Sequence, residues 1–130
     1  CLAKRHEADS VDEVDYVMSF EELGAFMVAY DIDVANCSEK ELNHEVTKYG
    51  RGFAQAGGVQ AAVVNAIGDK YSNIHIEGLD KKNQALLKSM AKKPDAQFVE
   101  VMACDGGCIN GPCSLAPLTL AKRQIKKVLE

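Results

Sequence analysis

One stretch, residues 98–113, constrains this chain more than any other: FVEVMACDGGCINGPC. A run rich in β-forming residues passes directly into a glycine-rich loop that carries three cysteines. Glycine adopts positive φ easily and lets the backbone approach a bulky ligand closely. Thiolates are soft ligands that select iron–sulfur clusters, zinc or copper(I). We therefore expect a strand followed by a loop that holds a large, soft inorganic group.

Hydrophobic periodicity and capping residues predict the elements around this loop. Ser19, with Glu22 three residues later, predicts a capping box that begins a helix. A second helix is expected after Gly57 and Gly58, with Gly68 at its end. The other expected elements are buried strands at residues 14–18, 74–76 and 98–103, helices at 80–92 and 118–129, and mainly loop at 31–56 with a short helix around 38–45.

Strands that alternate with helices in this way predict an α/β fold, with a mainly parallel sheet flanked by helices. In open sheets of this kind, ligands bind at the carboxyl ends of the strands. Cys104 comes directly after its expected strand, so it falls where such a site is expected.

Composition narrows the class of protein further. The net charge of −4 does not favour binding to nucleic acid. No apolar run approaches the roughly 18–20 residues that span a bilayer, so no membrane association is expected. Five cysteines, three of them between residues 104 and 113, argue against a secreted disulfide framework. They indicate metal binding in a reducing compartment, and we expect a cytoplasmic protein.

Two motifs resemble the signatures of one family. The string Glu-Val-Met-Ala-Cys-x-Gly-Gly-Cys-x-x-Gly, at residues 100–111, resembles the last cluster-binding signature of the iron-only (FeFe) hydrogenases. Residues 1–8, CLAKRHEA, resemble that family's middle signature, Pro-Cys-x-x-Lys-x-x-Glu, beginning at its cysteine. The two motifs stand in the family's order and at about its spacing, and the segment between them is similar as well. The resemblance covers essentially all 130 residues.

The resemblance implies an enzyme that reversibly reduces protons to H₂ at an H-cluster, which is a 4Fe–4S cubane joined to a diiron subcluster. It implies that Cys104 binds the cubane, that Cys108 bridges the cubane and the diiron subcluster, and that Cys1 is a further cubane ligand. By the same resemblance, Lys4 hydrogen-bonds a cyanide ligand of the diiron site and Glu7 helps to hold the site together.

Some of these residues also have an ordinary structural explanation. The alternative for Lys4, less favoured, is a solvated surface residue, and Glu7 three residues later could pair with it on one helical turn. Met102 either packs against the diiron end of the cluster or fills the core as a strand residue. Cys1 is either a ligand or a frayed terminal residue.

The remaining cysteines and histidines receive no role in the chemistry. Cys113 follows Pro112 where most family members continue with glycines. It is either a thiol near the cluster or a packed, inert cysteine, and we favour the second interpretation. Cys37 is expected to be structural. The three histidines, which show no ligand spacing, are His6, His44 and His75.

The family's first signature would lie upstream of residue 1. We therefore expect residues 1–130 to be the C-terminal lobe of a two-lobed catalytic domain, a fragment that is inactive alone and lacks the full cluster. The expected partners are the N-terminal lobe of the same protein and a ferredoxin-like electron carrier. Two alternatives remain open: a hydrogenase-like protein of iron–sulfur cluster assembly that evolves no hydrogen, and a hydrogen-sensing relative.

Overall fold

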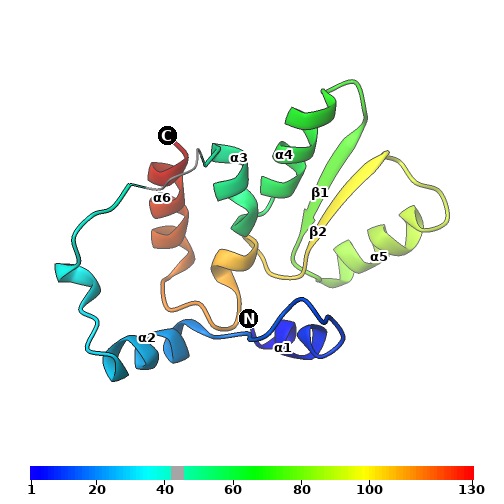
Figure 1. Cartoon of the computed structure of the whole chain (residues 1–130). Helices are drawn as coiled ribbons and strands as arrows, with labels where there is room; N and C mark the ends of the chain where they lie inside the picture. Colours follow the sequence, from blue (N-terminus) through cyan, green and yellow to red (C-terminus); the bar gives the residue numbers. More distant parts are fainter. Residues whose placement is uncertain (42–45) are drawn as a thin grey trace. The chain divides into compact units, whose positions relative to one another are not determined.

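The computed structural model describes residues 1–41 and 46–130 and consists of short helices and one small sheet (Figure 1). In chain order the elements are α1 (Leu2–Ala8), α2 (Phe20–Ala29), the 3₁₀ turn η1 (Val34–Asn36), α3 (Lys48–Arg51), η2 (Gly52–Ala54), α4 (Gly58–Ile67), β1 (Asn73–Glu77), α5 (Lys81–Met90), β2 (Phe98–Met102), η3 (Cys108–Asn110) and α6 (Leu118–Leu129).

These elements divide into two compact units. The first unit consists of Cys1–Glu45 and Gly111–Leu115, and the second consists of Val46–Asn110 and Ala116–Glu130. The described residues of the first unit include none that is buried, and Tyr16 and Val28 are 88% and 80% exposed. The sheet and the buried residues belong to the second unit.

The sheet confirms the α/β class, although it is small. β1 and β2 pair in parallel, with Asn73 opposite Phe98 and Glu77 opposite Met102. The crossover between the two strands contains α5, so this is a βαβ unit. Within the described residues the sheet has two strands, and both were expected from sequence.

The two faces of this sheet differ in chemistry. His75 and Glu100 are neighbours in register, and both are hydrogen-bonded to Gln60 of α4. Successive strand residues point to opposite faces, so Ile76 faces away from α4. Ile76 and Met90, the last residue of α5, are the buried hydrophobic residues, 5% and 7% exposed. Figure 1 shows α4 and α5 on either side of the strand pair.

Helix ends follow the expected capping chemistry. The Ser19 hydroxyl accepts a hydrogen bond from the Glu22 N–H, and the Glu22 carboxylate accepts one from the Ser19 N–H, which completes the capping box of α2. Asp80 caps α5 by accepting from the Asn83 N–H at 2.7 Å. α4 ends at Gly68 as predicted, with φ of 83°. These local signals depend on neighbouring residues alone, which explains why the sequence revealed them.

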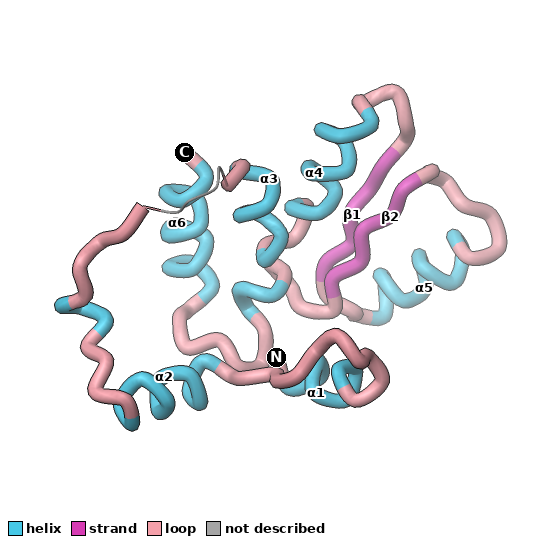
Figure 2. The backbone as a smooth tube through the Cα atoms, in the orientation of Figure 1, coloured by secondary structure: helices cyan, strands magenta, loops and turns pink. Residues whose placement is uncertain are grey.

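The strand expected at residues 14–18 is wrong. The structure has loop between α1 and α2, which Figure 2 shows. Val14 and Met18 are 41% and 48% exposed. A strand is stabilised by the strand beside it, and the described part of this chain pairs residues 14–18 with none. Apolar composition alone was therefore not sufficient evidence for a strand.

The expectation for residues 31–56 needs correction in part. Mainly loop was expected, but this stretch also contains η1, α3 and η2. Thr47 begins α3, because its hydroxyl accepts from the Gly50 N–H at 3.2 Å. The short helix expected around 38–45 falls partly outside the described residues, as does His44, and residues 38–41 are not helical.

The helices are also short by the standard of membrane-spanning segments. Among the residues that the structure describes, no helix has both the length and the apolar character needed to cross a bilayer.

Candidate metal-binding site

The candidate site is the loop Cys104–Asn110, here called the thiol loop, which leaves the carboxyl end of β2 (Figure 2). Gly78 donates its N–H to the Met102 carbonyl at 3.0 Å, so the ends of the two strands are tied together. Gly107 donates its N–H to the Cys104 carbonyl at 3.0 Å and closes a tight turn. Cys104 is half-buried, and Cys108 is exposed at the start of η3. The predicted position of Cys104 at a strand end is confirmed.

Two glycines give this turn its shape. Gly106 and Gly107 have φ of 82° and 86°, a backbone region that side chains with a Cβ rarely adopt. A Cβ on Gly106 would lie 2.6 Å from Leu118 Cδ1. A Cβ on Gly107 would lie 2.7 Å from the Gln55 carbonyl carbon and 2.9 Å from the Ala54 carbonyl oxygen. The positive φ was expected, but the close approach made by these glycines is to the protein's own atoms.

Hydrogen bonds from two other segments, and one within the loop itself, hold the thiol loop in place. The Glu77 carboxylate, at the end of β1, accepts from the Gly106 N–H at 2.6 Å. The Gly106 carbonyl accepts from the Ala56 N–H at 3.2 Å. Asn110 donates its side-chain amide to the Asp105 carbonyl at 2.9 Å. The loop is therefore fixed by its surroundings before any ligand is considered.

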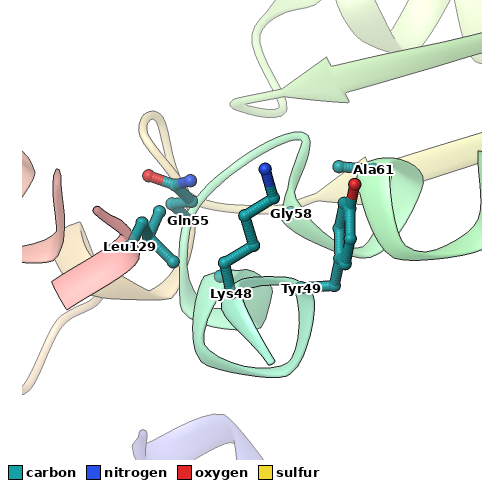
Figure 3. Close-up of a pocket in the computed structure, with 7 residues that line it drawn as sticks. Lys48, Tyr49, Gln55, Gly58, Ala61 and Leu129 are labelled. Carbon is teal, nitrogen blue, oxygen red and sulfur yellow. The ribbon is translucent and has the colours of Figure 1, made fainter. Parts of the chain in front are cut away.

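Residues Gly52–Gly57, here called the support segment, lie under the thiol loop and border two hollows. The first, about 350 Å³, lies beside the loop and is lined by Gln55, Ala56, Glu77, Gly106, Lys122, Lys126 and Leu129. The second, about 210 Å³, is shown in Figure 3 and is lined by Lys48, Tyr49, Gly52, Gln55, Gly58, Ala61 and Leu129. Gln55 of the support segment and Leu129 of α6 line both hollows.

The other predicted site residues belong to α1 and to β2. Lys4 and Glu7 form the expected ion pair one helical turn apart, and both side chains are more than half exposed. An exposed pair of this kind contributes about 0.2–1 kcal/mol. Cys1 precedes α1 and is exposed. Met102 ends β2 and is half-buried.

Cys37 and Cys113 lie outside the thiol loop. All five cysteines are free, so no disulfide constrains the chain. Cys37 is exposed and donates its thiol to the Asp33 carbonyl at 3.2 Å. Cys113 is half-buried and, with Pro112, lines a hollow of about 300 Å³ in the first unit, together with Leu2, Arg5 and Glu22.

The donor chemistry of the thiol loop fits two ligands of an iron–sulfur cluster. Cys104 and Cys108 offer soft thiols at an accessible strand end, on a loop whose backbone is already fixed. Within residues 1–41 and 46–130, no three His, Cys, Asp or Glu side chains gather closely enough to hold a metal ion. Cys104 and Cys108 are thiols of the kind that ligate iron–sulfur clusters.

One residue near the site was missed by the sequence analysis. Glu100, in the middle of β2, is only 5% exposed. Its Oε2 accepts from the Gln60 N–H at 3.1 Å, whereas its Oε1 is buried without a partner in the described structure. A charged residue at the centre of an apolar strand run was the available signal. In the sequence, Glu100 was interpreted only as the first residue of the cysteine motif at 100–111.

Comparison with known proteins gives the class of protein. Residues 1–112 match the family described as "Iron only hydrogenase large subunit, C-terminal domain". Because the match covers most of the chain, the chain belongs to this family.

A curated relative agrees with this assignment. The chain is similar to Iron hydrogenase 1 of Clostridium pasteurianum, with 36% identity over 73 residues. That alignment covers 55% of this chain and 13% of the relative. The family resemblance predicted from the two cysteine motifs is thus confirmed.

Proposed function

We propose that this chain forms part of the catalytic domain of an iron-only hydrogenase, which catalyses 2H⁺ + 2e⁻ ⇌ H₂. The observation that supports the proposal most is the thiol loop, a rigid turn that places two soft thiols at the carboxyl end of a parallel strand. When bound, an H-cluster would supply the iron centre at which protons are reduced and would pass electrons to it.

The chain's own residues would bind and orient this group. Cys104 and Cys108 would be its ligands from the thiol loop, with Cys108 joining the cubane to the diiron subcluster. Cys1 would be a further cubane ligand. Glu77 supports this arrangement indirectly, because it holds the Gly106 N–H and so fixes the turn between the two thiols.

Three further residues would act on the diiron side. The Lys4 ammonium would donate a hydrogen bond from Nζ to a cyanide ligand, and Glu7, which already pairs with Lys4, would orient it. Met102 would pack against the same end, where its polarizable thioether suits a soft neighbour.

Electrons would come from a soluble, ferredoxin-like carrier. The basic helix α6, beside the thiol loop, favours a carrier with an acidic surface. α6 bears Lys122, Arg123, Lys126 and Lys127 and has no acidic residue between its bounds. Two of these lysines line the hollow beside the thiol loop. A basic surface next to a redox centre raises the rate at which an acidic carrier associates.

Metal analysis of a longer polypeptide that includes the upstream lobe tests the proposal. After anaerobic maturation, the wild type and Cys37→Ser should hold the same iron and show infrared bands from carbonyl and cyanide ligands. Cys104→Ser and Cys108→Ser should lose iron, and Cys108→Ser should lose those bands. Full iron and unchanged bands in both loop variants would show that the thiol loop does not bind the cluster.

A further inference from the structure

The start of α4 lacks a cap of its own. The first N–H groups of a helix have no intrahelical acceptor and are usually satisfied by the side chain of the residue before the helix. α2 and α5 follow this rule with Ser19 and Asp80. α4 is preceded by Gly57, which has no side chain to offer.

Glu100 supplies the missing acceptor from another element. Its Oε2 accepts from the N–H of Gln60, in the first turn of α4, at 3.1 Å. The side-chain oxygen of the same glutamine accepts a hydrogen bond from His75 Nδ1 at 3.0 Å, and its side-chain amide donates to Asn73 Oδ1. Glu100, Gln60 and His75 therefore join both strands to the start of this helix.

The burial of Glu100 is unusual for a charged side chain. Glutamate is rarely this buried unless it is well partnered, because a buried polar atom without a hydrogen bond is unfavourable. Glu100 is 5% exposed, and its Oε1 has no partner in the part of the chain that the structure describes. The hydrogen bond from the Gln60 N–H satisfies the other carboxylate oxygen, Oε2, at 3.1 Å.

The thiol loop depends on the segment that leads into α4. Gly107 packs on Gln55 and Ala54, and Ala56 donates its N–H to the Gly106 carbonyl at 3.2 Å. The support segment continues directly into α4, so the position of the first turn of α4 fixes the position of this surface. Glu100 also lies on β2, the strand that leads to Cys104.

We propose that Glu100 is a positioning residue: by capping α4 from β2, it sets the support segment against the thiol loop and so fixes the geometry of Cys104 and Cys108. That the two thiols bind a cluster rests on the proposed function. The capping and its effect on the thiols do not.

Thiol modification of the metal-free 130-residue chain tests this proposal. Glu100→Met keeps the length of the side chain but removes the acceptor, and Glu100→Gln keeps an accepting oxygen. The alkylation rate of Cys104, measured by mass spectrometry relative to Cys37, should rise about tenfold in Glu100→Met, because the loop opens locally more often. It should stay within about twofold of wild type in Glu100→Gln. Amide exchange in residues 52–60 and 104–110 should follow the same order.

Two controls separate positioning from general destabilisation. Met90→Ala removes a buried side chain of α5 and destabilises the second unit without touching the cap, so its relative Cys104 rate should match wild type. Gln60→Pro removes the donor N–H, and Gln60→Ala keeps it, so only the proline variant should behave like Glu100→Met. This pair also gives an answer if Glu100→Met does not fold.

Three results would overturn the proposal: an unchanged Cys104 rate in Glu100→Met and Gln60→Pro, an equal rise in Met90→Ala, or an equal rise in Glu100→Gln. These outcomes are independent of the metal analysis. If the loop variants keep their iron, the proposed function fails while the role of Glu100 in fixing the loop stands.

Discussion

Gly106 and Gly107 determine the shape of the thiol loop through two separate constraints. Both have positive φ, and both leave room for the protein's own atoms, Leu118 in one case and the support segment in the other. The sequence alone identified the glycines and their positive φ. It could not identify what they pack against, because Leu118 and Gln55 are distant from them in sequence.

Gly107→Ala should be strongly destabilising. Its Cβ would meet backbone atoms of Gln55 and Ala54, which cannot turn away as a side chain could. We expect the free energy of unfolding to fall by about 2–4 kcal/mol, as the sum of backbone strain and overpacking. Urea denaturation followed by circular dichroism measures this change.

Gly68→Ala is the matched control for that variant. Gly68 has a similar φ of 83°, but nothing lies within 4 Å of its Cβ position. Its substitution should cost about 1–3 kcal/mol through backbone strain alone. Equal losses in the two variants would show that Gly107 is not packed on the support segment.

Among the elements, α2 offers a pH-dependent contact. The Ser19 backbone N–H, and after it the Arg5 side chain, hydrogen-bond the Glu22 carboxylate and lower the pKa of Glu22 below its ordinary value. In the unfolded chain the pKa returns to its ordinary value of 4.5. The stabilisation from Glu22 is therefore present above that pH and is lost as the pH falls through the lowered, folded-state pKa.

NMR titration of the Glu22 carboxyl carbon should show this lowered pKa, and α2 should lose helical structure in acid. In Glu22→Gln the acid-induced loss should be shallower, because the titrating group is gone. Replacing Arg5 by Gln should raise the pKa of Glu22 only part of the way, since the Ser19 N–H remains. An ordinary pKa for Glu22 in the wild type would contradict the capping geometry.

α6 is the element that we expect to meet the electron carrier. Reversing Lys122 and Lys126 to Glu places negative charge in the hollow beside the thiol loop, and the KM for an acidic carrier should rise about tenfold at low salt. The difference should shrink as ionic strength rises, because salt screens exposed charges. Reversing Lys82 and Lys88 of α5, which are equally exposed, is the control and should change the KM little.

Elements were predictable where local signals specified them. Capping residues predicted where three helices begin or end: α2 begins after Ser19, α5 begins after Asp80, and α4 ends before Gly68. Residues 98–102 were predicted as a strand from their β-forming composition and from the glycine-rich loop directly after them. Residues 14–18 are as apolar as residues 98–102 but pair with no strand in the described structure. The difference lies in the partner, which sequence spacing does not reveal.

Glu100 shows the same limit for the site. The motif containing it was recognised, and Cys104 was placed correctly directly after the strand. Its capping of α4 depends on a contact between residues 40 positions apart, Gln60 and Glu100. Nothing in the local sequence indicates that the first turn of α4, which follows Gly57, needs an acceptor from another element.

At the scale of the whole molecule, the chain corresponds to a small part of its relative. Its alignment covers 13% of Iron hydrogenase 1 of Clostridium pasteurianum, so the proposed activity concerns a longer polypeptide. The first unit also has apolar side chains that its described residues leave exposed, Tyr16 and Val28 among them. Contact with further protein would cover such surface.

The 130 residues expressed alone should therefore purify without the complete cluster. The family resemblance implies more cubane ligands than Cys1, Cys104 and Cys108 supply. Iron analysis should give less than the full complement, and infrared spectra should lack carbonyl and cyanide bands. Stoichiometric diiron in the isolated chain would contradict this expectation.

Hydrogen evolution by Cys108→Ser, in a matured polypeptide that contains both lobes, tests the central claim most directly. A serine oxygen is a harder and poorer bridge between irons than a thiolate, so activity should be abolished. Folding should be kept, because the change costs only about 1 kcal/mol. Cys37→Ser should retain nearly all activity. Hydrogen evolution retained in Cys108→Ser would contradict the assignment of the thiol loop as the hydrogenase site.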